Sequence, residues 1–391
     1  MSIAEWFDSE PMRQQRLMFS LPTRNSACHK CWKQEEHSNT SRRHKSNQKS
    51  VIFQKENFAD SYLQSPGYDK FEYSFANNGK YTGMPIDLHI DLGNHCNLAC
   101  KMCWGRASSK IAAQEIKWGE RENEKTLVNW TQDQEVWDRF VSELLEIPNL
   151  KNIHFMGGET MLSPRFKDLV NQFDAANRYE VCFSFVTNGT IWDEDLVTKL
   201  SKFERVGIEV SIETLGKQNE YIRQGTNNAE VLANIEKFSE YANGNNVTVT
   251  IRPALGLLSL GYYHSLIEYC LQNQLLIKSL PMVRPAHLVS TVLPRSIRQA
   301  YKQSYLDLIE KYKLYFDLDV DYNESDWHNY KQVALSEIHK ALYEIDLPDN
   351  ANQESLLGEL VFQMKRWDQV YGFNMHDYYP ELEGLLNNYG Y

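Results

Sequence analysis

The chain has 391 residues, of which 42% are hydrophobic and 12% aromatic, so a large packed core is available. Its formal net charge of −11 disfavours a broad nucleic-acid-binding surface, which would need clustered Lys and Arg. No apolar run is long enough to cross a membrane, and the first residues lack the apolar centre of a signal peptide, so we expect a cytoplasmic protein with reduced cysteines and no membrane partner.

Residues 1–84 are polar and irregular in pattern. They contain the pair Cys28-x2-Cys31 and a basic stretch at 41–49. For the basic stretch, a solvated loop and a contact for a phosphate or an acidic partner both remain open. We predict an irregular N-terminal extension over this segment.

From about residue 85 to 290, short apolar runs rich in β-branched residues alternate with helical patterns. In one helix, Thr131 and Gln134 have the spacing of a capping box, and Pro148 follows the helix end. A second clear helix is predicted over 229–242. This alternation predicts a parallel sheet covered by helices. The predicted strands are 86–92, 152–156, 181–187, 206–212, 247–253 and 275–283.

Two further segments complete the organisation. The polar connection 105–130 is long enough to be either disordered or a functional loop. Residues 291–391 carry amphipathic helical patterns near 296–313, 326–345 and 353–371. We therefore predict an α/β fold: an N-terminal extension at 1–84, a partial, TIM-like (β/α)6 barrel at 85–290 and a helical region at 291–391. A doubly wound sheet is the alternative arrangement of the same six units.

Three of the seven cysteines fall within eight residues, at Cys96, Cys100 and Cys103, directly after the first predicted strand. Loops at the carboxyl ends of parallel strands carry the chemistry of such folds. Three interpretations compete: a zinc site completed by His95, three small buried hydrophobes, or an iron–sulfur cluster held by thiolates. A four-iron cluster has four corners, so three cysteines leave one iron open to a small molecule.

The C-x3-C-x2-C spacing after a first strand resembles the radical S-adenosylmethionine (radical SAM) superfamily. The resemblance covers about residues 85–290 and implies a 4Fe-4S cluster on Cys96, Cys100 and Cys103, whose open iron chelates SAM. Gly157, Gly158 and Glu159 match the glycine-rich GGE motif of the family. Met102 and Trp104 depart from the usual pattern, in which an aromatic residue precedes the third cysteine.

Three further residues are candidates for SAM contacts by the same resemblance. Asn188 ends the third strand in "VTNGT", Ser211 ends the fourth in "EVSIETLG", and Arg223 follows in "EYIRQG". A guanidinium suits the SAM carboxylate. Each has a plainer interpretation as well, which for Ser211 is a strand-end cap and for Arg223 a surface ion pair with Glu220.

The resemblance implies a reductive cleavage of SAM to a 5′-deoxyadenosyl radical that abstracts hydrogen from a substrate. A low-potential electron donor of the flavodoxin or ferredoxin type is the implied partner. The substrate remains open between a peptide or protein, a small metabolite and a nucleotide, and no catalytic acid or base is identified. The rival interpretations are a zinc-binding α/β scaffold without enzymatic activity and a cluster protein that only transfers electrons.

The segment around Cys28 and Cys31 is similar to the N-terminal part of radical SAM proteins with a SPASM-related twitch region, which are often encoded by phages. Those proteins have further cysteines ahead of this pair, and the present sequence has none there. A second cluster, a small zinc site with His29 or His37, a redox-active dithiol and a relic without function therefore remain open for Cys28 and Cys31.

Overall fold

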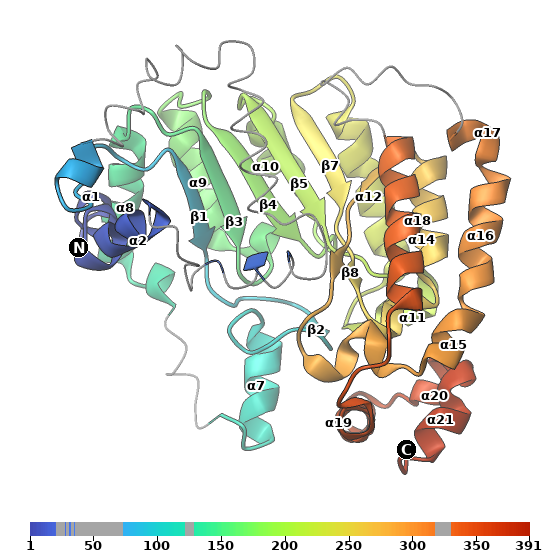
Figure 1. The fold of residues 1–391 in the computed structure, drawn as a ribbon. Helices are drawn as coiled ribbons and strands as arrows, with labels where there is room; N and C mark the ends of the chain where they lie inside the picture. The colour runs from blue at the N-terminus through green and yellow to red at the C-terminus, as the bar shows by residue number, and fades with distance from the viewer. Residues whose placement is uncertain (21–27, 29–30, 33–34, 36–72, 122–128, 317–329) are drawn as a thin grey trace. The chain divides into compact units, whose positions relative to one another are not determined.

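The computed structural model describes residues 1–20, 28, 31–32, 35, 73–121, 129–316 and 330–391 (Figure 1). The chain divides into two compact units. One comprises residues 1–86 and 138–150, and the other residues 87–137 and 151–391. The basic stretch 41–49 and the predicted zinc ligands His29 and His37 lie outside the described residues.

The first unit begins with α1 (Ile3–Phe7) and α2 (Glu10–Ser20). Asp8, between them, accepts hydrogen bonds from Arg13 at 2.7 Å and from the backbone N–H of Tyr81 at 2.9 Å. The hydrogen bond from Arg13 is the main reason why the pKa of Asp8 falls to about 2. Cys28 and Cys31 are half-buried free thiols.

A parallel six-stranded sheet forms the centre of the second unit (Figure 1). All six predicted strands are present, in the spatial order β1-β3-β4-β5-β7-β9, which confirms the α/β fold. The last predicted strand is shorter than expected, because β10 (Leu280–Pro281) leaves the main sheet and pairs with β8 (Ala254–Leu255). The six strands are β1 (Asp87–Asp91), β3 (Asn152–Met156), β4 (Cys182–Thr187), β5 (Arg205–Val210), β7 (Val247–Ile251) and β9 (Leu276–Ile277).

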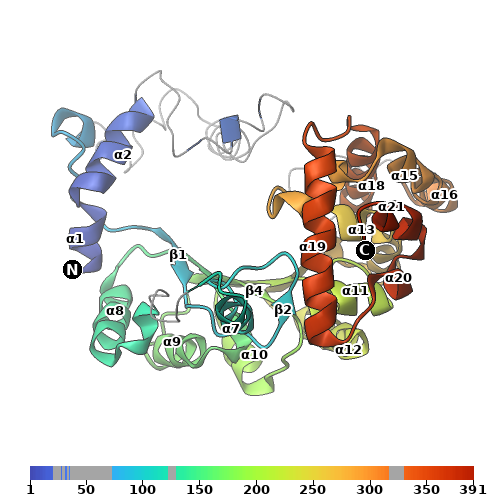
Figure 2. The same ribbon diagram turned by 90° about the horizontal axis from the view of Figure 1, so that it is seen from below.

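Helices α9 (Pro164–Ala175), α10 (Glu194–Leu200) and α12 (Asn228–Ala242) lie on one side of the sheet (Figures 1 and 2). Aromatic side chains fill the space between, with ring centroids 4.9 Å apart for Phe155 and Phe166 and 5.4 Å apart for Phe173 and Phe183. Because side chains alternate along a strand, this packing commits every second residue to the helical side. The residues between them face the opposite side.

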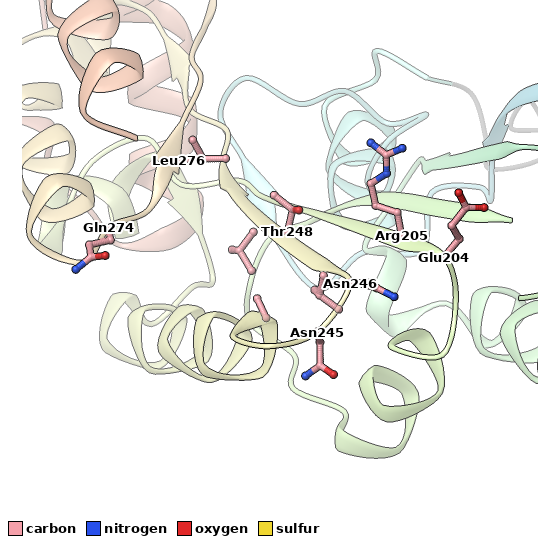
Figure 3. Close-up of a pocket in the computed structure, with 10 residues that line it drawn as sticks. Glu204, Arg205, Asn245, Asn246, Thr248, Gln274 and Leu276 are labelled. Carbon is pink, nitrogen blue, oxygen red and sulfur yellow. The ribbon is translucent and has the colours of Figure 1, made fainter. Parts of the chain in front are cut away.

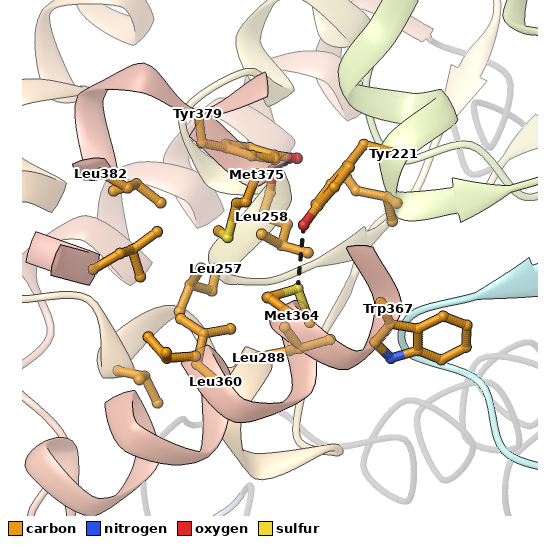
Figure 4. Close-up of a cluster of buried hydrophobic side chains, with 14 of the residues drawn as sticks. Tyr221, Leu257, Leu258, Leu288, Leu360, Met364, Trp367, Met375, Tyr379 and Leu382 are labelled. Atoms are coloured by element: carbon orange, nitrogen blue, oxygen red, sulfur yellow. Dashed lines mark hydrogen bonds between the residues drawn. The ribbon is translucent and has the colours of Figure 1, made fainter. Parts of the chain in front are cut away.

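The predicted helical region after residue 291 is confirmed. A cluster of buried apolar side chains joins α19 to α11 and α13, with Tyr221, Leu258 and Met364 among its members (Figure 4). No helix in the described ranges has the length and apolar character needed to span a bilayer. Apart from α7, which is described below, the helices not yet named are α8 (Gln134–Glu146), α11 (Gly216–Ile222), α13 (Leu257–Leu260), α14 (Tyr263–Gln272), α15 (Arg295–Ala300), α16 (Lys302–Lys311), α17 (Lys313–Phe316), α18 (Tyr330–Asp346), α19 (Gln353–Tyr371), α20 (Met375–Tyr378) and α21 (Glu383–Asn387).

Two local predictions were wrong. The capping box at Thr131 does not form, because its hydroxyl donates to the carbonyl of Leu92, while the carboxylate of Asp133 accepts from the N–H of Val136 and caps α8. The connection 105–130 also contains a helix, α7 (Ser109–Lys117), which the side chain of Ser108 caps at its N-terminus. Residues 122–128 of that connection lie outside the described residues.

Arg298 on α15 is fully buried and closes the C-terminal end of α18. Its guanidinium donates to the carbonyls of Glu344, Ile345 and Leu347 at 2.8–2.9 Å and to the carboxylate of Asp349 at 2.8 Å. A methionine there would remove a fully buried guanidinium and the hydrogen bonds that it donates to the end of α18, so we expect Arg298→Met to lower the free energy of unfolding by about 3 kcal/mol.

Urea unfolding followed by circular dichroism measures this loss. Arg295 is exposed on the same helix, and Arg295→Met is expected to change the free energy of unfolding by less than about 0.5 kcal/mol. Equal effects of the two substitutions would show that Arg298 does not hold the end of α18.

Candidate functional site

The loop that carries the three cysteines follows β1 and is fixed by backbone contacts to the segment after β3. Beyond the two strands, the N–H of Leu92 donates to Met156 at 3.0 Å, that of Gly158 to Gly93 at 2.6 Å and that of Glu159 to His95 at 2.8 Å. The pairing of β1 with β3 therefore continues past the end of the sheet. The predicted GGE segment and the predicted cysteine loop lie directly against each other.

The glycines of this segment allow the contact. A Cβ atom on Gly157 would lie 2.4 Å from the carbonyl oxygen of Gly93, and one on Gly158 would lie 2.2 Å from that of His95. Gly157 also has φ 126°, a conformation that favours glycine. Within the described structure, the close approach that these glycines permit is to the cysteine loop itself.

Glu159 holds the next strand end in place. Its carboxylate, only 1% exposed, accepts hydrogen bonds from the hydroxyl of Thr187 at 2.6 Å and from the N–H groups of Met161 and Asn188 at 2.9 and 2.6 Å. Burial raises the pKa of Glu159, although these hydrogen bonds oppose the rise. The carboxylate predicted to contact SAM is thus occupied by donors from its own chain.

Asn188 connects the end of β4 to the cysteine loop. Its amide nitrogen donates to the side-chain oxygen of Asn97 at 2.9 Å, and the amide of Asn97 donates to the hydroxyl of Thr190 at 2.8 Å. Asn97 follows Cys96 directly. The structure therefore brings Asn188 beside the first cysteine of the motif, as the sequence predicts.

Arg223 lies beside the second cysteine. The two-residue strands β2 (Ala99–Cys100) and β6 (Arg223–Gln224) pair with each other, and Nη1 of Arg223 lies 3.6 Å from Sγ of Cys100. Its Nε and Nη2 form a two-pronged ion pair with the buried carboxylate of Glu213, with Nη2 at 2.7 Å. The plainer interpretation, an ion pair with Glu220, was wrong: Glu220 accepts instead from the N–H of Asn228 at 2.9 Å.

Burial and neighbouring charges act on Arg223 in opposite directions. Burial alone would lower the pKa of the guanidinium, whereas Glu213 and the sulfur of Cys100 raise it, and the net change is upward. Arg223 is therefore a permanent cation at the cysteine loop. Ser211 lies nearby at the end of β5, where its N–H donates to the carbonyl of Thr187 at 2.8 Å and its side chain is half-buried.

The three thiols influence one another. Burial raises the pKa of Cys96 to about 11. Cys100 donates to the sulfur of Cys103, and this hydrogen bond raises the pKa of Cys100 and lowers that of Cys103. The guanidinium of Arg223 favours the thiolate form of all three.

A donor set of this kind fits a metal cluster. Buried thiols lose their protons readily only when a cation shares their charge, and thiolate is the form that binds iron. Among the residues that the structure describes, no three His, Cys, Asp or Glu side chains converge on a point suited to one ion. In a cluster, each cysteine binds a different iron, so its sulfurs need not converge on one point.

Lys101, between the second and third cysteines, is a feature that sequence reasoning missed. Its side chain is buried, and its Nζ lies 4.0 Å from the ring centroid of Tyr221 and 5.3 Å from that of Trp367. Burial lowers the pKa of Lys101 to about 8, although Asp368 and Cys100 oppose the fall. A lysine in a polar loop gives no sequence signal of burial.

A polar row crosses the face of the sheet opposite α9, α10 and α12. His89, His154, Ser184 and Thr248 are in register across β1, β3, β4 and β7, with Gly207 of β5 between the last two. The rings of His89 and His154 lie 4.9 Å apart, and His154 Nδ1 lies 2.8 Å from the hydroxyl of Ser184. Alternating polar residues in "DLHID" and "NIHFM" were the available signal, because a parallel sheet covered on both faces has continuous apolar strands.

Two cavities adjoin the sheet and the loop. One of about 590 Å³ lies at the amino ends of β5 and β7, where Arg205, Asn246 and Thr248 line it, at the edge of the sheet opposite the cysteine loop (Figure 3). The other, of about 410 Å³, adjoins the loop at Asn97 and is also lined by Gln224. No cysteine of the described structure lines either cavity, and the second one borders the loop that carries the three cysteines.

Comparison with known proteins finds a family model that matches the part of the chain around the cysteine loop. Residues 90–256 match the model of the radical SAM superfamily, and this stretch contains the three cysteines, the GGE segment and Arg223. This part of the chain is thus similar to the radical SAM domain. In that superfamily, the domain implies a 4Fe-4S cluster and SAM as cofactors.

Individual relatives are more distant. The chain is similar to the sporulation killing factor maturation protein SkfB of Bacillus subtilis (strain 168), with 24% identity over 188 residues that cover 48% of this chain and 40% of SkfB. It is also similar to SuiB of Streptococcus suis bound to S-adenosylmethionine, with 14% identity, a TM-score of 0.38, and coverage of 79% of this chain and 58% of SuiB. For native anSMEcpe with bound AdoMet, the identity is 18% and the TM-score 0.41, covering 60% of this chain and 65% of the other. The chain therefore spans less than two thirds of each of these proteins.

The ion pair of Arg223 with Glu213 is expected to stabilise the folded protein. The side chains of Arg223 and Glu213 are only 12% and 1% exposed, so removing either partner leaves a charge without compensation. We expect Glu213→Gln to lower the free energy of unfolding of the metal-free protein by about 3 kcal/mol. The double variant Glu213→Gln/Arg223→Met should lose less than the sum of the two single losses.

A double-mutant cycle in urea measures this coupling. The matched control is Lys199 with Asp195, an exposed ion pair of α10 with a Nζ–Oδ2 distance of 2.7 Å. Its coupling is expected to stay below about 0.5 kcal/mol. A coupling between Arg223 and Glu213 as small as that of the control would contradict a stabilising role.

Proposed function

We propose that this protein is a radical SAM enzyme in which Cys96, Cys100 and Cys103 hold a 4Fe-4S cluster. The observation that carries the proposal is the contact between the cysteine loop and the GGE segment, which only glycines permit at Gly157 and Gly158. When bound, the cluster would supply the electron that cleaves SAM to a 5′-deoxyadenosyl radical, which abstracts hydrogen from the substrate.

The contacts of this chain with SAM follow from which polar groups are already engaged. The carboxylate of Glu159 already accepts hydrogen bonds from Thr187, Met161 and Asn188. We therefore assign the SAM ammonium to the backbone carbonyls of 157–159. Glu213 engages Nε and Nη2 of Arg223, so Nη1 is the nitrogen that we assign to the SAM carboxylate. Asn188 and Ser211 belong to the same strand-end edge and complete the proposed SAM site.

We propose that the substrate lies against the polar row and is a peptide or a protein segment. From His89 to Thr248 the row crosses four gaps between strands, or about 19 Å at the usual spacing. An extended chain of about six residues covers that length, at about 3.3 Å for each residue. A small metabolite or a nucleotide would use only part of it.

Other parts of the proposal concern the rest of the chain and its partner. The segments 1–84 and 291–391 flank a catalytic core at 85–290, and a flavodoxin- or ferredoxin-type protein supplies the electron. A cytoplasmic location suits reduced thiols and such a donor. For Cys28 and Cys31, a second metal site remains a prediction that iron content tests.

The proposed activity is tested by anaerobic reconstitution with iron and sulfide, reduction with dithionite and addition of SAM. We expect about four irons per chain and release of 5′-deoxyadenosine, both of which Cys100→Ala should lose because it removes a cluster ligand. Iron in excess of one cluster that Cys28→Ala removes would support a second site.

Cys270→Ala is the matched control, since Cys270 is a fully buried thiol of α14 away from the loop. It should keep its iron and its activity. A colourless protein that retains about one zinc after chelation would contradict the proposal and favour the zinc-binding scaffold.

The substrate proposal is tested with extracts of cells grown in deuterated medium, by measuring deuterium in the 5′-deoxyadenosine. We expect a protease-sensitive fraction to supply deuterium, because the substrate is a peptide or protein. In His89→Phe, the deuterium content of 5′-deoxyadenosine should fall at least tenfold, since the half-exposed ring of His89 forms one end of the polar row.

Lys199→Met, on the far helical side, should transfer deuterium as the unaltered protein does. If only a small-molecule or a nuclease-sensitive fraction supplies deuterium, the substrate is a metabolite or a nucleotide and not a peptide. Unchanged deuterium transfer in His89→Phe would show that the polar row is not part of the substrate site.

A further inference from the structure

Lys101 is an ionisable side chain buried inside the cysteine loop. It is 3% exposed, and its Nζ has no hydrogen-bond partner among the residues that the structure describes. Its backbone N–H donates to the carbonyl of Ile222 at 2.9 Å, next to the pairing of β2 with β6. The backbone of Lys101 is thus fixed in position, and Lys101 lies between two proposed cluster ligands, Cys100 and Cys103, along the chain.

The surroundings of this ammonium come from outside the loop. Tyr221 of α11 and Trp367 of α19 present their rings at 4.0 and 5.3 Å, and both lie at the same side of the apolar cluster in Figure 4. Such ring faces attract a cation, more strongly where water is excluded. The helical region after residue 291 therefore supplies part of the enclosure of a charge in the cysteine loop.

Asp368, the neighbour of Trp367, provides the opposing charge. It is 6% exposed, and its Oδ2 accepts from the N–H of Met375 at 2.7 Å and from the hydroxyl of Tyr391. Its Oδ1 has no partner in the described structure. Carboxylate and ammonium attract each other electrostatically without a hydrogen bond between them.

A buried charge of this kind is costly. Removing an ammonium from water costs several kcal/mol, and an apolar side chain in the same space is often more stable. The arrangement is explicable if the charge acts on another charge nearby. The sulfurs of the cysteine loop are the groups that become negative when they bind iron, and Cys100 and Cys103 lie within two residues of Lys101.

We propose that Lys101 is a positioning charge that makes the iron–sulfur cluster easier to reduce, and that Tyr221, Trp367 and Asp368 hold it in place. This inference rests on the proposed function. A cation near the cluster stabilises the form that carries the additional electron, and a nearby carboxylate opposes that effect. The helical region is thereby linked to the electronic properties of a site on the first strand.

The experiment is a redox titration of the reconstituted full chain, followed by electron paramagnetic resonance. At a fixed potential, we expect Lys101→Met to lower the ratio of reduced to oxidised cluster about tenfold, a downward shift of about 59 mV for one electron. Lys101→Arg keeps the charge and should restore the ratio. Asp368→Asn removes the opposing charge and should shift the potential upward.

Opposite shifts in Lys101→Met and Asp368→Asn separate an electrostatic role from a structural one, since general loosening of the loop would shift both in the same direction. Lys117→Met, at an exposed site on α7, is the control and should titrate like the unaltered protein. If Lys101→Met assembles no cluster, Asp368→Asn tests the inference by itself: an upward shift of the potential supports it and a downward shift contradicts it.

Two results overturn the inference and can be told apart. If the unaltered protein takes up no iron, the proposed function and this inference both fail. If a cluster assembles but Lys101→Met keeps the unaltered potential, or Asp368→Asn shifts it downward, the inference fails and the proposed function stands.

Discussion

The backbone contact between 93–95 and 157–159 is the constraint on which the rest of the site depends. It extends the pairing of β1 with β3 beyond the sheet, and it sets the position of a loop that has no regular structure of its own before β2. Because Gly157 and Gly158 leave no room for a Cβ atom, the sequence of this segment is dictated by the cysteine loop that it touches. The buried carboxylate of Glu159 then accepts hydrogen bonds from Thr187 and Asn188, which fix the end of β4 relative to the same segment.

Charge is the second organising element. Two cations accompany the cysteine loop, and each has a buried carboxylate as its counterpart. Arg223 of β6 lies beside the loop, and Lys101 belongs to the loop and extends toward Trp367 of α19. The two pairs differ in kind. Glu213 holds Arg223 with a two-pronged hydrogen-bonded pair, whereas Asp368 acts on Lys101 without a hydrogen bond. A site built to bear negative sulfur and an additional electron requires such compensation in a poorly solvated environment.

Hydrophobic periodicity predicted the strands well, because it is a local property of the sequence. The GGE segment and Asn188 were singled out by the resemblance to radical SAM proteins, and both lie against the cysteine loop. Sequence patterns failed where the partner was set by tertiary structure. Arg223 pairs with Glu213 rather than with the nearer Glu220, and Thr131 donates to Leu92 instead of capping α8. The burial of Lys101 follows from rings on α11 and α19, and a row such as His89, His154 and Ser184 exists only once the strand register is known.

The central claim is that Cys96, Cys100 and Cys103 hold a four-iron cluster whose remaining iron is open to SAM. Mössbauer spectroscopy of the protein reconstituted with iron-57, before and after SAM is added, tests it most directly. We expect a four-iron cluster in which SAM alters the signal of one iron and leaves the other three nearly unchanged. The claim would be contradicted by a spectrum without cluster iron, or by a cluster in which SAM changes the signal of none of the irons.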